Sequence, residues 1–76
     1  MGVQMESYSK QQKRLLAIGL AKGELSHQDI IKVYTDVRFG KNSMKRLMLL
    51  DFFTITQTGF LFNQEKNNEV IEILQT

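Results

Sequence analysis

The amino-acid sequence predicts a small α+β domain that is mostly helical. Three stretches before residue 52 repeat their apolar residues with the period of an α-helix, and residues 53–62 then change to alternation. The 76 residues include no proline, which favours compact structure over an extended linker. One small domain with a thin core is therefore expected, because short chains bury a smaller fraction of their surface.

The first predicted helix spans residues 9–22. Leu15, Ile18 and Gly19 recur at helical spacing, and basic residues precede this apolar stretch. Gly23 stands where a left-handed residue would end the helix. Residues 1–8 show no periodicity and are predicted to form a flexible N-terminal end.

The second predicted helix starts after Ser26 and ends near Arg38. Ser26 and Asp29 have the spacing of a capping box, with aspartate in place of the preferred Glu or Gln. Leu25 precedes the cap and is expected to pack beneath this helix. Its apolar stripe is formed by Ile30, Val33, Tyr34 and Val37.

A tight turn is expected at residues 38–42, because Gly40 and Asn42 both tolerate positive φ. The third helix then covers about residues 42–51. Met44 and Leu47 are expected in the core, while Lys45 and Arg46 lie on another side of the helix.

A β-hairpin follows at residues 53–62, with its turn at residues 57–59. Residues 63–76 are predicted to form a loop and a short C-terminal helix. Its apolar residues either cover the domain's own core or pair in a homodimer across a two-fold axis. They are Val70, Ile71, Ile73 and Leu74.

Three helices, a glycine-bearing turn and a hairpin directly after the third helix form a layout that resembles the winged helix-turn-helix DNA-binding domain. The resemblance covers residues 9–62. Its most specific part is residues 43–62, where a leucine-rich helix end runs into an apolar strand, a polar turn with glycine and an aromatic strand. The C-terminal helix lies outside it, and the hairpin corresponds to the wing.

This resemblance implies sequence-specific binding of double-stranded DNA by a small transcriptional regulator. The recognition helix, about residues 42–51, would enter the major groove. Arg46 could then bind guanine and Asn42 adenine, the pairings that their side chains favour. The DNA-binding residues that the resemblance implies are Asn42, Ser43, Lys45 and Arg46 on bases, with Arg38 and Lys41 on phosphates.

Charge is distributed unevenly along the chain. Residues 1–46 hold nine of the ten Lys and Arg against four acidic residues, which gives +5, whereas residues 47–76 hold one against four, which gives −3. The segment from Arg38 to Arg46 contains four basic residues and no acidic one. A basic segment at the expected recognition helix favours a nucleic-acid partner.

Two other functions remain open from the sequence. A winged helix can join a larger replication, transcription or remodelling complex as a protein-interaction module, because fold does not determine function. Leu49, the wing without Lys or Arg, and the acidic last third would serve that role. Single-stranded nucleic acid is the other candidate, because five phenylalanines could supply stacking surfaces.

Several other classes are not expected. The chain has no cysteine and one histidine, so no metal site and no cofactor are predicted. Ser26, His27 and Asp29 are near neighbours and cannot converge as a hydrolytic triad, so the chain is not expected to be an enzyme. The apolar run from Leu15 to Ala21 is too short to span a bilayer, and a cytoplasmic protein is expected, nucleoid-associated in a bacterium or archaeon.

Overall fold

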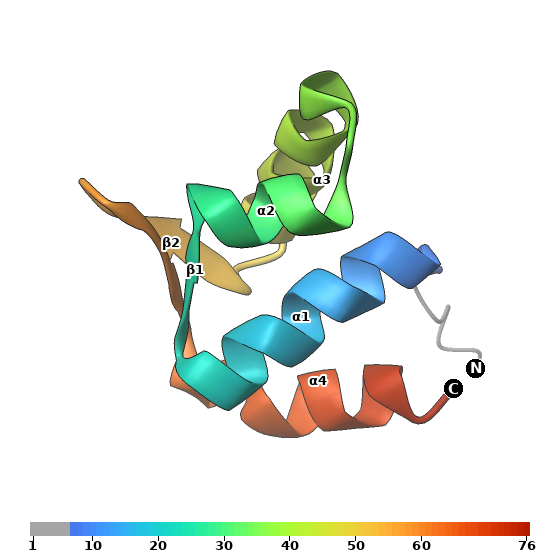
Figure 1. The fold of residues 1–76 in the computed structure, drawn as a ribbon. Helices are drawn as coiled ribbons and strands as arrows, with labels where there is room; N and C mark the ends of the chain where they lie inside the picture. The colour runs from blue at the N-terminus through green and yellow to red at the C-terminus, as the bar shows by residue number, and fades with distance from the viewer. Residues whose placement is uncertain (1–6) are drawn as a thin grey trace.

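The computed structural model describes residues 7–76. They form an α+β fold that is mostly helical, with four α-helices and one small antiparallel sheet in the described part of the chain (Figure 1). The elements in chain order are α1 (Lys10–Lys22), β1 (Glu24–Ser26), α2 (His27–Val33), α3 (Val37–Leu49), β2 (Phe53–Ile55), β3 (Gly59–Phe62), the 3-10 helix η1 (Gln64–Lys66) and α4 (Asn67–Leu74). The predicted fold class is confirmed at this level.

Helix α1 begins and ends where the sequence predicts. The Ser9 side chain accepts from the backbone N–H of Gln12, and the Gln12 side chain accepts from the backbone N–H of Ser9, so both form a capping box. Gly23 ends the helix with φ of 82°, in the left-handed region that favours glycine. Leu15 and Leu16 of this helix are fully buried in the core.

The sheet contains a strand that the sequence pattern did not predict. Strand β1 pairs with β3, which also pairs with β2, so the strand order is β1-β3-β2. Leu25 of β1 lies opposite Phe60 and is buried. A Cβ atom at Gly59 would collide with the backbone carbonyl oxygen of Leu25, so this close pairing requires glycine. The hairpin of β2 and β3 confirms the prediction for residues 53–62.

Helix α2 starts at the predicted cap but ends early. Ser26 and Asp29 form the expected capping box, with the Asp29 backbone N–H 3.2 Å from Ser26 Oγ. The helix ends at Val33, and Tyr34 already has extended backbone angles. The prediction that this helix reaches Arg38 is therefore wrong.

The predicted turn at residues 38–42 is also wrong, because these residues form the first part of α3. Asp36 is the cap: its carboxylate accepts from the backbone N–H of Arg38 at 2.9 Å. Gly40 serves packing instead of a turn, since a Cβ there would lie 3.0 Å from Cγ2 of Ile30 in α2. Helix α3 thus starts at Val37, about five residues before the prediction, and ends at Leu49.

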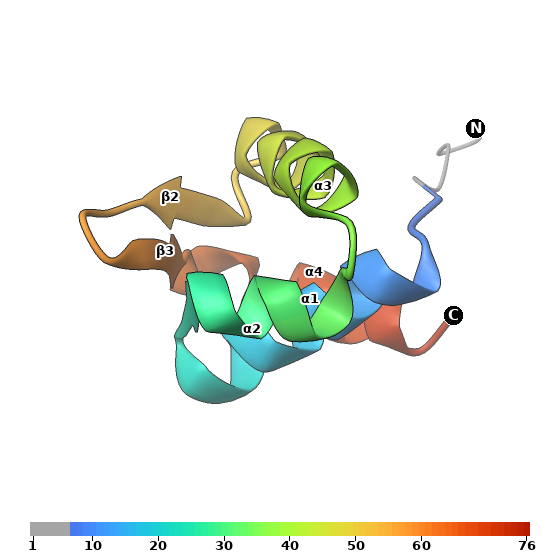
Figure 2. The same ribbon diagram turned by 45° about the horizontal axis from the view of Figure 1, so that its top comes forward.

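The core lies between the helices and the inner face of the sheet. Helix α1 runs between α2 and α4, and α3 crosses above them beside the hairpin (Figures 1 and 2). Four aromatic residues in and beside the hairpin are buried, as are Met44 and Leu47 of α3. Those aromatic residues are Phe52, Phe53, Phe60 and Phe62.

Helix α4 packs on its own chain. Val70 is fully buried, and Ile73 and Leu74 are half-buried against the core. Of the four apolar residues that the sequence offers for a homodimer, Ile71 is the exposed one. Dimerisation through this helix stays a prediction, with little free apolar surface on α4 to support it.

The predicted flexible end covers residues 1–8, of which residues 1–6 lie outside the described part. Tyr8, in contrast, packs on the core with its ring 6.1 Å from that of Phe52. Within residues 7–76, the longest helices have 13 residues, and none has the length and apolar character needed to cross a membrane.

Candidate nucleic-acid interface

The outer side of α3 carries a row of exposed residues. Arg38, Asn42, Lys45 and Leu49 follow one another by three or four positions, so all four lie on one side of a helix that turns about 100° per residue. Lys41 is exposed beside this row. We call these five residues the outer row. No acidic residue occurs between Val37 and Leu49.

The side of α3 that faces the protein explains this exposure. Gly40, Ser43, Met44 and Leu47 are its buried residues, and they lie opposite the outer row. These residues anchor the middle of the helix on the protein. The cations of the outer row do not contribute to that packing and remain exposed to solvent.

The cations of the outer row differ in their partners. Arg38 Nη2 lies 3.3 Å from Oδ2 of Asp36, and its side chain is 86% exposed, so this ion pair is weak. Within residues 7–76, Lys41 and Lys45 form no ion pair. Two uncompensated lysines thus lie about one helical turn apart, a spacing that can contact successive phosphates.

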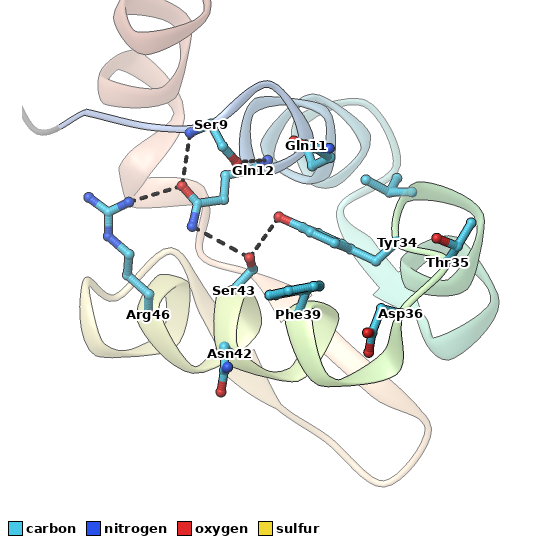
Figure 3. A pocket seen from close by; sticks show the side chains of 11 residues that line it. Ser9, Gln11, Gln12, Tyr34, Thr35, Asp36, Phe39, Asn42, Ser43 and Arg46 are labelled. Atoms are coloured by element: carbon cyan, nitrogen blue, oxygen red, sulfur yellow. Dashed lines mark hydrogen bonds between the residues drawn. The ribbon is translucent and has the colours of Figure 1, made fainter.

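Ser43 is not part of the outer row. It is 8% exposed, and its hydroxyl lies 2.7 Å from the Tyr34 hydroxyl (Figure 3). A longer contact of 3.5 Å joins it to Nε2 of Gln12 in α1. The assignment of Ser43 as a base-contacting residue is therefore corrected: Ser43 connects α3 to α1 and to the end of α2.

Arg46 likewise belongs to this internal network. It donates from Nη1 to Oε1 of Gln12 at 2.9 Å, and its guanidinium lies 4.6 Å from the centre of the Tyr8 ring. Its side chain is half-buried and lies about 100° around the helix from Lys45. Arg46 therefore does not point with Lys45 as the sequence suggested, and it is held by groups of the protein itself.

A cavity of about 520 Å³ lies beside this network, between the start of α1, the α2–α3 connection and α3. Figure 3 shows Tyr34, Ser43, Gln12 and Arg46 linked across it, while Asn42 points away from these residues. In the described part of the chain, no buried side-chain polar atom lacks a hydrogen-bond partner. The network therefore has a structural role, since its polar groups already satisfy one another.

The hairpin offers a different surface. Its strands and turn contain no Lys or Arg from residue 53 to residue 62. Thr56 accepts at Oγ1 from the backbone N–H of Gly59 and donates its own N–H to the Gly59 carbonyl, which closes the turn. Ile55 and Leu61 are exposed large apolar residues of the two strands. This hairpin therefore offers no cationic side chain to phosphates.

Sequence reasoning missed a second feature of α3. Val37, read as part of the second helix, is the first residue of α3, and it lines an apolar groove together with residues of α2 and the hairpin. The clustering needs the correct helix boundary and the strand pairing, so the one-dimensional pattern contained no direct signal for it. Leu49, which the sequence offers as a protein contact, is 79% exposed on the side of Lys45.

No group of three or more metal-binding side chains lies together within residues 7–76. Comparisons with family models, with curated proteins and with solved structures found no match for this chain.

Proposed function

We propose that this chain is a winged helix protein that binds double-stranded DNA through α3. The order helix, strand, helix, helix, hairpin supports that fold assignment, because the third helix is followed directly by an antiparallel wing. A helix of 13 residues is about 20 Å long, and the major groove, about 12 Å wide, accommodates an α-helix. The outer row is the observation that carries the proposal.

The individual roles follow from the positions on α3. Asn42 and Lys45 are the residues for base edges, with the amide of Asn42 suited to adenine. Lys41 and Arg38 contact phosphates. Only Asn42 and Lys45 are left to select DNA bases, because Ser43 and Arg46 bond to other groups of the protein.

The protein would act as a transcriptional regulator by binding DNA, without catalysing a reaction. Specificity from one helix with two base-contacting side chains is low. Pairing of two copies would raise it by engaging two half-sites. Sedimentation of the protein alone and with duplex DNA measures whether such a dimer forms.

The test is the double substitution Lys41→Glu with Lys45→Glu. Both side chains are exposed, so the fold should persist, while the affinity for duplex DNA should fall at least about tenfold at low salt because a phosphate contact of Lys41 and a base contact of Lys45 are lost. The slope of log affinity against log salt should become shallower by roughly 0.9 for the lost phosphate contact. Fluorescence anisotropy of a labelled duplex over a salt series measures both quantities.

The matched control is Lys10→Glu with Arg14→Glu, which makes the same charge change at exposed positions of α1. If both double variants weaken binding equally, the effect arises from net charge and α3 is not the interface. Wild-type protein that binds no duplex at low salt refutes the proposal. Stronger binding to single-stranded oligonucleotides than to duplex DNA would instead identify the protein as a single-strand binder.

A protein-interaction module is the second candidate function, and Leu49 favours it. This leucine is 79% exposed at the end of the outer row, where an isolated base-contacting helix has no need for it. Leu49→Arg separates the two functions. It adds a cation and should keep or raise DNA affinity, whereas an interface with a protein partner would lose a buried anchor.

A further inference from the structure

A second surface lies between α2, α3 and the hairpin, where the core is incompletely closed. Helix α2 has no buried residue in the structure, although its apolar stripe faces α3 and the sheet. A groove of about 280 Å³ opens beside it. The side chains that matter for the argument are Ile31, Val37, Lys41, Met44, Met48 and Ile55.

Three of these apolar side chains remain largely in contact with water. Val37 is 60% exposed, Ile31 is 54% exposed and Ile55 is 67% exposed. They come from α2, α3 and β2, yet they line the same groove. Clustered exposed apolar residues on a small protein mark an interaction site more often than scattered ones do.

The charge of the groove restricts its occupant. Lys41 lines it, no Asp or Glu does, and Lys41 forms no ion pair within the described residues. Lys45 follows one helical turn later on α3. An occupant with a carboxylate next to its apolar side chains would therefore pair with these lysines while it fills the groove.

The groove has a volume of about 280 Å³ and mostly apolar walls, which suit the side chains of a protein partner. Met44 and Met48 form part of its wall, and methionine adapts to differently shaped apolar partners.

We propose that this groove docks an acidic amphipathic segment of a partner protein, which inserts aliphatic side chains between Val37 and Ile55 and places a carboxylate on Lys41. The groove overlaps the proposed DNA-binding side of α3 at Lys41, and the docking does not depend on DNA binding. Lys41 would take part in both, so bound DNA and bound segment should weaken each other.

The test uses a synthetic helical peptide with leucines at i, i+3, i+4 and i+7 and glutamates at the flanking positions, the pattern of groove-binding helices. Titration into isotope-labelled protein should shift the backbone amides of Ile31, Val37, Lys41 and Ile55. The same peptide with lysines in place of glutamates should bind at least about tenfold more weakly, since the paired charges become repulsive.

Two pairs of variants provide the controls. Ile55→Asp and Val37→Asp should each weaken binding about tenfold or more by placing a charge in the groove. Leu61→Asp and Phe39→Asp change equally exposed apolar residues, 51% and 62%, of the hairpin and α3 that do not line it. These two variants should bind the acidic peptide like the wild type.

Equal weakening by groove and control variants overturns the proposal, as does the absence of any shift at the groove. Concentration-dependent self-association that Ile55→Asp abolishes would make a second copy the occupant. Shifts of Ile31 and Ile55 on addition of duplex DNA alone would assign the groove to DNA. Wild-type protein that binds the acidic peptide but not duplex DNA would refute the proposed DNA-binding function and leave the docking groove intact.

Discussion

Asp29 connects three parts of the chain through one carboxylate. Its Oδ2 accepts from the backbone N–H of Ser26 at 2.9 Å, from the Ser26 hydroxyl at 3.1 Å and from Lys22 Nζ at 2.9 Å. The Ser26 backbone bond, followed by the bond from Lys22, holds the pKa of Asp29 below its ordinary value. The Asp29 side chain is 12% exposed but that of Lys22 is 51% exposed, so water screens the ion pair in part.

This lowered pKa predicts a defined dependence of stability on pH. Asp29 stabilises the fold at pH above its unfolded pKa of about 3.9, and the contribution disappears as pH falls through the lower folded pKa. Asp29→Asn should therefore lower the free energy of unfolding by about 1 kcal/mol at pH 7. The difference from wild type should shrink in strong acid. Urea denaturation at several pH values measures it.

The control for this prediction is Asp51→Asn. Asp51 is exposed and has φ of 67°, a conformation that asparagine also tolerates. This substitution should leave stability at pH 7 close to that of the wild type. An Asp29→Asn variant as stable as Asp51→Asn at pH 7 would contradict the role assigned to the carboxylate.

At the scale of the element, α3 depends on its cap. The helix begins at Val37 because Asp36 accepts the backbone N–H of Arg38, and the carboxylate also lies at the positive end of the helix dipole. Because α3 starts at Val37 and not near residue 42, it begins more than one turn earlier than the sequence predicts. Arg38 and Lys41 belong to α3 only because of this earlier start.

Asp36→Ala should lower the free energy of unfolding by about 1 kcal/mol through loss of the cap. Asp36→Asn is the matched variant, since asparagine caps as well as aspartate and removes only the charge. It should lose less stability, and it should bind DNA slightly better if α3 lies against phosphates. Thermal unfolding and duplex titration measure the two effects. Equal destabilisation by both variants would argue against the cap.

At the scale of the whole molecule, α4 closes the core against α1. Val70 is fully buried there, and Lys13 Nζ of α1 donates to the Thr76 carbonyl at 3.1 Å. A chain of this length has little stability to lose, because it buries only about 60% of its unfolded surface. The acidic end of the chain is thus part of the fold as well as of its charge asymmetry.

Truncation after Gln64 should therefore unfold most of the protein, because it removes α4 and exposes the α1 surface beneath it. The single substitution Val70→Ala should cost about 2 kcal/mol of unfolding free energy. Ile71→Ala, at an exposed neighbour, should cost less than about 1 kcal/mol. Chemical denaturation compares the two. A truncated chain as stable as the full one would show that α4 is dispensable.

The sequence alone determined the fold class and most helix and strand starts of this protein. Ser9 and Ser26 cap helix starts and Gly23 ends a helix, and each acts on residues within one helical turn. The alternation of apolar and polar residues likewise predicted the hairpin, because such signals depend only on neighbouring residues.

Only the tertiary structure decided where α3 begins and which of its residues face outward. Gly40 is a residue type that favours turns, but it lies within α3, where close packing against Ile30 of α2 leaves little room for a side chain. Ser43 and Arg46 were drawn inward by Tyr34 and Gln12, which lie 9 and 34 residues away in the chain. Contacts between distant segments override local preference, so the candidate site was predicted in part and the groove not at all.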